Sequence, residues 1–241
     1  MVSLPPGIQD KVRQASMAPE VSGAYSSGGS TVSRARPSAE PTERQVPVSC
    51  SLPETIPFFT IGHSTRSIPD FVDLLRAGEV QMVVDVRSIR RSRANPQFNE
   101  ETLAEALSPY QVGYLSIPEL GGRRRKERSV DQDLNSFWNN RSFHNYADYA
   151  LTDPFKRGLA QLISVGASRH CAIMCAESVW WRCHRRIIGD YLLQQGAEVY
   201  HLMEGAKVIP ATLTKGAVLV DEQRIIYPAA MDGECCRGEH A

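Results

Sequence analysis

The densest group of reactive side chains in this sequence follows the apolar run 171–174. The segment 175–186, CAESVWWRCHRR, carries two thiols, a carboxylate, an imidazole and three guanidinium groups within twelve positions. An apolar run that ends in a short polar loop and then opens a helix is typical of the strand–loop–helix joints at which α/β proteins place their chemistry. Folding alone does not require such residues, so we expect this segment to belong to a functional site.

Two thiols of this segment are candidate nucleophiles. Cys175 ends the apolar run beside Glu177, and Cys183 stands between Arg182 and His184 at the start of a predicted helix. Positive neighbours at a helix start stabilise the thiolate form of cysteine. A free cysteine is also among the most frequently buried residue types, so a packed structural thiol is the alternative for each.

The same thiols and two histidines suggest an alternative, a metal site. Its ligands would be Cys175, Cys183, His184 and His63. The spacing matches no compact zinc ribbon, and adjacent Cys and His side chains rarely point at the same ion without a special turn. We therefore predict no cofactor and keep the metal site as an alternative.

Basic residues predict an anionic ligand. Arg182, Arg185 and Arg186 lie near a predicted helix N-terminus, where guanidinium and backbone N–H groups bind anions. Two further basic runs, 87–93 and 123–128, follow other predicted strands. Such runs are usually solvated surface, but together with neighbouring aromatic residues they also fit phosphate contact and base stacking. The expected partner is a small anionic or nucleotide-like ligand, and nucleic acid is the alternative.

The elements that must position these residues alternate between strands and helices. Apolar runs of strand length lie at 58–62, 80–86, 112–117, 170–175 and 198–202. Helical patterns lie between them at 67–75, 99–107, 146–165 (interrupted by Asp153-Pro154) and 183–195, and two short strands are expected near 217–220 and 224–227. This alternation predicts an α/β fold, an open three-layer Rossmann-like sandwich with a mostly parallel sheet of about five strands.

In such sheets ligands bind beyond the carboxyl ends of the strands. The residues that follow the predicted strands therefore complete the site. We expect the catalytic residues to be Cys175, Glu177, Cys183 and His63. We expect the substrate-binding residues to be Ser64, Arg66, Asp85, Arg87, Ser88, Arg93, Gly121, Gly122, Arg182, His184 and Arg185.

Asp85 is the lone acid of an apolar strand, so its carboxylate needs a partner. Arg87 shares a strand face with Asp85 only if the backbone stays extended. We therefore expect Asp85 to hold a helix N-terminus or to orient His63, as a member of a structural network.

Short motifs at these strand ends resemble a known family. They are GHSTR (62–66), VDVRS (84–88), SRANPQF (92–98), ELGG (119–122) and CAE…RCHR (175–185). Their order resembles that of the family called domain of unknown function 488, over about residues 58–202. The resemblance implies a fold and a site at these motifs, and no particular reaction.

Composition limits the remaining choices. The chain has 241 residues, zero formal net charge and six cysteines, and no run approaches the roughly 18 apolar residues of a membrane span. We expect a disordered extension at 1–52, a single α/β domain at 53–228 and a flexible tail at 229–241. The expected location is the cytoplasm, without a membrane partner, and the sequence does not indicate the oligomeric state.

Two classes of function follow. The first is a cysteine-dependent hydrolase or transferase that acts on a phosphate-bearing or nucleotide-like substrate. Redox chemistry with a dinucleotide is disfavoured, because Gly62-His-Ser lacks the required series of glycines. The alternative is a non-catalytic protein that binds nucleic acid or nucleotide, or a Cys/His metal-binding protein.

Overall fold

The structure is a computed structural model that describes residues 56–221 and 223–229. The extension predicted at 1–52 lies outside the described residues, as do positions 230–241 of the predicted tail. Cys50, Cys235 and Cys236 therefore have no structural account.

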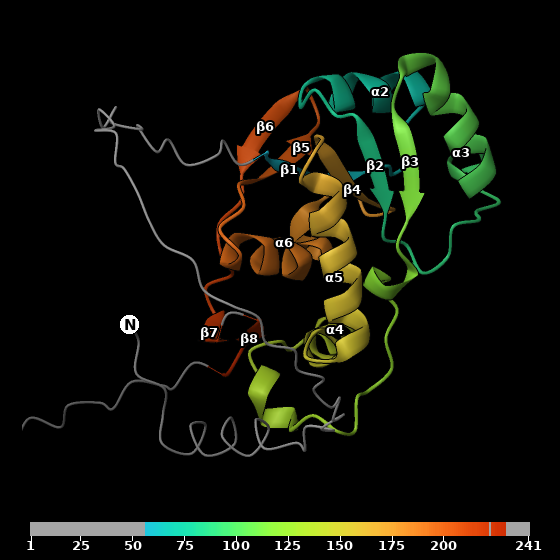
Figure 1. Ribbon diagram of the computed structural model, residues 1–241. Helices are drawn as coiled ribbons and strands as arrows, with labels where there is room; N and C mark the ends of the chain where they lie inside the picture. Colours follow the sequence, from blue (N-terminus) through green and yellow to red (C-terminus); the bar gives the residue numbers. More distant parts are fainter. Residues whose placement is uncertain (1–55, 222, 230–241) are drawn as a thin grey trace, which may run out of the picture. The chain divides into compact units, whose positions relative to one another are not determined.

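The central sheet has six strands in the order β3-β2-β4-β1-β5-β6 (Figure 1). Their bounds are β1 Phe58–Gly62, β2 Met82–Asp85, β3 Gly113–Ser116, β4 Cys171–Cys175, β5 Val199–Met203 and β6 Lys207–Pro210. Strands β1 to β5 are parallel, and β6 pairs antiparallel with β5 at the edge. The predicted mostly parallel α/β sheet is confirmed, with β6 as a strand that the sequence analysis did not predict.

Helices cover both faces of the sheet, which confirms the three-layer arrangement. Alternate residues of β1 point to opposite faces: Phe59 packs with α2 (Ile68–Arg76) and α3 (Glu100–Leu107). Phe58 packs with α4 (Arg141–Ala150), α5 (Asp153–Gly166) and α6 (Arg185–Gln194). Both faces of the strands are therefore buried in apolar cores, as expected for a parallel sheet.

Local sequence signals explain where two helices begin. Ser67 caps α2 because its hydroxyl accepts a hydrogen bond from the Asp70 N–H at 3.2 Å. The dipeptide Asp153-Pro154 does not merely interrupt one helix, since it forms the first turn of α5 after α4 has ended. Proline fits this position because the first helical N–H groups lack intrahelical partners.

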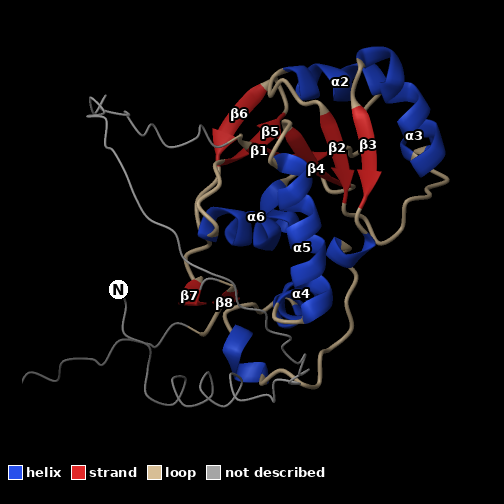
Figure 2. Ribbon diagram, in the orientation of Figure 1, coloured by secondary structure: helices blue, strands red, loops and turns tan. Residues whose placement is uncertain are grey.

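The end of the described chain forms a small hairpin apart from the main sheet (Figure 2). Strands β7 (Val218–Asp221) and β8 (Arg224–Ile226) pair antiparallel, as the predicted tail strands imply. Tyr227 follows β8 and is completely buried, with its hydroxyl donating to Asp190 at 2.8 Å. Across the described residues, none of the helices has the length and apolar character needed to cross a membrane.

The sheet order places three strand ends side by side. β4 lies between β1 and β2, with Gly62 paired to Cys175 and Asp85 paired to Met174. The loop after β4 then continues along β1, since the N–H of His63 donates to the Cys175 carbonyl at 2.9 Å. Gly62 permits this approach, because a Cβ there would lie 1.9 Å from the Glu177 carbonyl oxygen.

Candidate functional site

A cavity of about 340 Å³ lies at these adjacent strand ends. Predicted site residues form most of its wall: Arg87, Ser88, Gly122, Cys175, Glu177, Arg182 and His184. The other lining residues are Ile89, Arg123, Ser142, Phe143 and Ala176. The strand-end rule therefore brings residues of β2, β4 and the segment after β3 to one cavity.

A cluster of Cys175, Cys183 and His184 forms part of this site. The Nδ1 atom of His184 lies 3.9 Å from the Cys175 Sγ and 3.5 Å from the Cys183 Sγ. A 3₁₀ turn at Trp180–Arg182 precedes the cluster, and the Cys183 N–H donates to the Trp180 carbonyl. This turn lets the adjacent Cys183 and His184 point at one place, which we expected adjacent residues to do only with a special turn.

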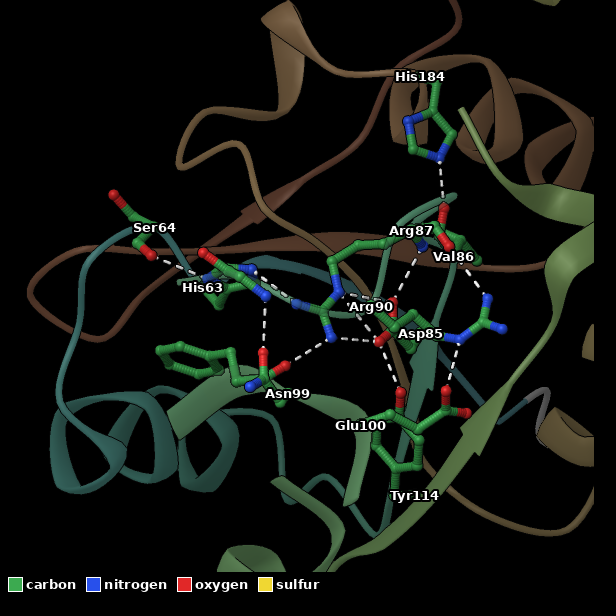
Figure 3. Close-up of polar contacts among 12 residues, drawn as sticks. His63, Ser64, Asp85, Val86, Arg87, Arg90, Asn99, Glu100, Tyr114 and His184 are labelled. Atoms are coloured by element: carbon green, nitrogen blue, oxygen red, sulfur yellow. Dashed lines mark hydrogen bonds and ion pairs between the residues drawn. The ribbon is translucent and has the colours of Figure 1, made fainter. Parts of the chain in front are cut away.

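The backbone just after β2 fixes the orientation of the His184 ring. Its Nε2 atom lies 3.0 Å from the Val86 carbonyl oxygen, as Figure 3 shows. A carbonyl oxygen only accepts, so Nε2 carries a proton and Nδ1 is the ring nitrogen that faces the two sulfur atoms. The ring also packs edge-on against Tyr146, with 4.9 Å between centroids.

The two thiols differ in their proton affinity. Burial raises the pKa of the Cys183 thiol, but hydrogen bonding from Cys175 and the charge of Arg185 outweigh it and hold that pKa well below its ordinary value. Hydrogen bonding to Cys183, together with burial, raises the pKa of Cys175. The pair therefore holds its proton on the cavity-lining sulfur and its negative charge on the buried one.

Arg185 supports Cys183 and does not line the cavity. Its side chain is 1% exposed, its Nε donates to the Cys183 Sγ at 3.2 Å, and it also donates to the Glu177 carbonyl. The structure thus places this predicted substrate-binding residue behind the cavity wall.

Asp85 and Arg87 form a buried ion pair, and the expectation that Arg87 would not serve as the partner of Asp85 is wrong. The Arg87 N–H and Nε both donate to the Asp85 Oδ1 at 2.9 Å. Tyr114 donates to the Asp85 Oδ2 at 2.6 Å (Figure 3). Asp85 is therefore a member of a structural network, although its partner is not the one we expected.

His63 belongs to the same network and lies outside both the cavity lining and the thiol cluster. Its ring stacks on Phe98 with 4.3 Å between centroids, and its Nε2 lies 3.1 Å from the Arg87 Nη1. Burial lowers the pKa of His63 to about 4, which keeps the imidazole neutral. Its Nδ1 contacts the Ser64 carbonyl at 2.8 Å, so both ring nitrogens have partners within the fold.

The remaining predicted residues, Gly121 included, do not line the cavity. Ser64, Arg66 and Arg93 do not line it, and Arg66 donates to the Gly62 carbonyl. Gly121 approaches the Ser88 side chain, whose hydroxyl accepts from the Arg123 N–H at 2.8 Å. This bond ties the second basic run to the end of β2.

Sequence reasoning did not assign some of the lining residues. Arg123 directly follows Gly122 in the basic run 123–128, so this adjacency could have predicted that Arg123 lines the cavity. Ser142 and Phe143 come from the first turn of α4, which no motif marks. Their contribution depends on how α4 packs on the sheet, which a local pattern does not encode.

Comparison with known proteins gives one family. The family model described as "Domain of unknown function DUF488" matches residues 67–192, which include β2, β3 and β4 and the thiol cluster. No curated protein and no solved structure matches the chain.

Proposed function

The chain belongs to the DUF488 family, and from its site we propose that it is a cysteine-dependent hydrolase or group transferase. Its substrate is a small phosphate-bearing or nucleotide-like anion that binds in the cavity at the strand ends. One observation carries this proposal: the thiol of Cys175 lines the same cavity as Arg123 and Arg182. A thiol beside guanidinium groups can attack an electrophilic centre whose negative charge those groups hold.

Each residue has a role that follows from its position. The Cys175 thiol passes its proton to the His184 Nδ1, which lies 3.9 Å away, as its sulfur bonds to the electrophilic centre. The bond from that centre to the leaving oxygen breaks, and the proton passes to that oxygen. Water or an acceptor hydroxyl then displaces Cys175 and completes hydrolysis or transfer. Glu177, whose exposed side chain lines the cavity, is the alternative proton carrier.

Alkylation of Cys175 tests this proposal without a known substrate. The reduced full-length protein, kept free of metal by a chelator, is treated with anionic iodoacetate or neutral iodoacetamide, and modification is followed by peptide mass spectrometry. Because a cationic cavity concentrates anions, the iodoacetate-to-iodoacetamide rate ratio at Cys175 should exceed that of free glutathione by about tenfold. Pyrophosphate should slow both reactions.

Matched variants separate the cavity from general charge. Arg182→Gln should lower the rate ratio, whereas Arg169→Gln, an exposed arginine just before β4, should leave it unchanged. A ratio equal to that of glutathione with no protection by pyrophosphate would overturn the anion cavity. The raised pKa of the Cys175 thiol slows its alkylation without preventing it, so a Cys175 that neither reagent modifies would overturn its role as the reactive centre.

Nucleic acid remains the alternative partner because Trp181, with a side chain 47% exposed, adjoins the cavity residue Arg182. An exposed indole beside a cation suits stacking of an unpaired base. Binding of single-stranded oligonucleotides that weakens in salt and in Trp181→Ala would favour this alternative.

A cytoplasmic location is also part of the proposal.

A further inference from the structure

The cluster of Cys175, Cys183 and His184 has the dimensions of a metal ligand set. Its three ligand atoms all lie within 4.8 Å of one another, and the two sulfur-to-Nδ1 distances are 3.9 and 3.5 Å. A tetrahedral Zn²⁺ with Zn–S near 2.3 Å and Zn–N near 2.0 Å holds its ligand atoms about 3.6 to 3.8 Å apart. Only small side-chain movements would therefore bring these three atoms around one ion.

His184 is oriented as a metal-binding histidine. Its Nε2–H donates to the Val86 carbonyl, so Nδ1 is the ring nitrogen that faces the sulfur atoms. A backbone carbonyl on the second ring nitrogen is a usual outer partner of metal-binding histidines, since it fixes both tautomer and ring orientation. This orientation comes from the residue after β2, whereas Cys175 ends β4 and Cys183 follows the 3₁₀ turn.

Gly122 leaves room beside the same nitrogen. A Cβ at this position would lie 2.4 Å from the His184 Nδ1, closer than packed side chains allow. The space next to the His184 Nδ1 therefore depends on Gly122, which comes from the segment after β3.

The surrounding charges suit thiolate ligands. Arg185 donates to the Cys183 Sγ at 3.2 Å and is buried with it. Such donors commonly contact metal-bound thiolates and orient them. Cys175 and His184 line the cavity, whereas Cys183 is 3% exposed, so an ion held by all three would be reached from the cavity.

We propose that Cys175, Cys183 and His184 form a Zn²⁺ site whose occupancy masks the thiol of Cys175. The mixed sulfur and imidazole donors select a thiophilic divalent ion, and three protein ligands leave one position for water or an anion. Binding replaces the proton of the Cys175 thiol with the metal ion, and that proton passes to the solvent. The masking part of this inference rests on the proposed function of Cys175, but the binding part does not.

Zinc titration of the full-length protein tests the site. The parent protein for all variants carries serine at Cys50, Cys235 and Cys236, so that these cysteines do not bind the metal. The reduced, metal-free protein competes with a chromophoric chelator for Zn²⁺, and Co²⁺ provides a second readout through its visible spectrum. We expect one equivalent with submicromolar affinity and a tetrahedral, thiolate-containing Co²⁺ spectrum.

Variants identify the ligands. Cys183→Ser and His184→Gln should each weaken Zn²⁺ binding by at least about a hundredfold. Cys171 lies on β4 but outside the cluster, so Cys171→Ala should bind Zn²⁺ as the parent does. The Co²⁺ spectrum of the parent keeps the test decisive if a variant fails to fold. Binding weaker than micromolar, or affinity unchanged by both ligand variants, would overturn the site.

Alkylation separates this inference from the proposed function. Zn²⁺ should block modification of Cys175 by iodoacetate, and a chelator should restore it. Tight zinc binding with a Cys175 that stays unreactive after chelation would retain the metal site and overturn the enzymatic role. Rapid alkylation of the metal-free protein without zinc binding would overturn the metal site alone.

Discussion

Arg87 and Asp85 form a multiply bonded ion pair at the carboxyl end of β2. The Arg87 Nη2 lies 2.6 Å from the Asp85 Oδ2, and the side chains are only 4% and 0% exposed. The same Nη2 donates to the Phe98 carbonyl at 2.7 Å, which attaches the segment before α3 to the sheet. This pair is therefore the link between the end of β2 and the wall of the cavity, which Arg87 itself lines.

The Asp85–Arg87 pair predicts a large stability effect. Asp85→Asn removes the charge that compensates the buried guanidinium, so the free energy of unfolding should fall by about 3 to 5 kcal/mol. Asp73→Asn is the matched control, since Asp73 pairs with Arg76 in an exposed bridge and its loss should cost less than about 0.5 kcal/mol. Urea unfolding followed by circular dichroism measures both. Equal effects of the two substitutions would show that the buried pair does not hold the strand end.

A second prediction concerns Arg124, whose side chain binds the backbone just before the cavity-lining residue Gly122. Its guanidinium lies 3.8 Å from the centre of the Tyr149 ring and donates to the carbonyls of Pro118, Glu119 and Gly121. Lysine lacks the planar fork, so Arg124→Lys should lower the free energy of unfolding by about 1 to 2 kcal/mol.

Arg125→Lys is the control for this change, because Arg125 is exposed and adjacent in sequence. Thermal unfolding compares the two variants. The iodoacetate reaction at Cys175 should also slow in Arg124→Lys alone, as Gly122 and His184 lose their fixed spacing. Lower stability with an unchanged alkylation rate would show that Arg124 stabilises the fold without shaping the cavity.

The predictable part of this molecule was the part with buried apolar strands. Runs such as 58–62 and 171–175 are apolar because both faces of a parallel strand are buried, so periodicity and topology together placed their ends at one edge. The same reasoning did not predict strand β6, because all four of its residues are exposed and it ends in Pro210. At a sheet edge, pairing depends on a neighbouring strand more than on the segment's own pattern.

The candidate site was predictable by position and less so by orientation. The residues that follow each strand could be assigned to one edge, but the sequence did not show that the Arg87 guanidinium would bond to the Asp85 carboxylate. His63 also follows a strand, yet its ring stacks on Phe98 away from the thiol cluster. Such directions depend on side-chain conformation and tertiary packing, which residue spacing does not determine.

A final prediction concerns acid stability. Burial lowers the pKa of His201 and of His63 to about 4, from 6.5. His201 also shares a hydrogen bond of 2.7 Å with Thr60 and stacks on Trp180. Above pH 6.5 neither the folded nor the unfolded state protonates these rings, so the fold keeps its full stability. As pH falls from 6.5 to 4, only the unfolded chain takes up the protons, and folding stability is lost over this window.

Each histidine should contribute about 2 kcal/mol of this loss, after allowance for solvent screening. His201→Gln should therefore reduce the difference in unfolding free energy between pH 7 and pH 4.5, even if it lowers stability at both. Arg169→Gln should leave the difference unchanged, because arginine does not titrate in this range. Urea unfolding at a series of pH values measures how the free energy of unfolding changes with pH. An identical pH dependence in His201→Gln and the parent protein would mean that this imidazole is protonated as readily in the fold as in the unfolded chain.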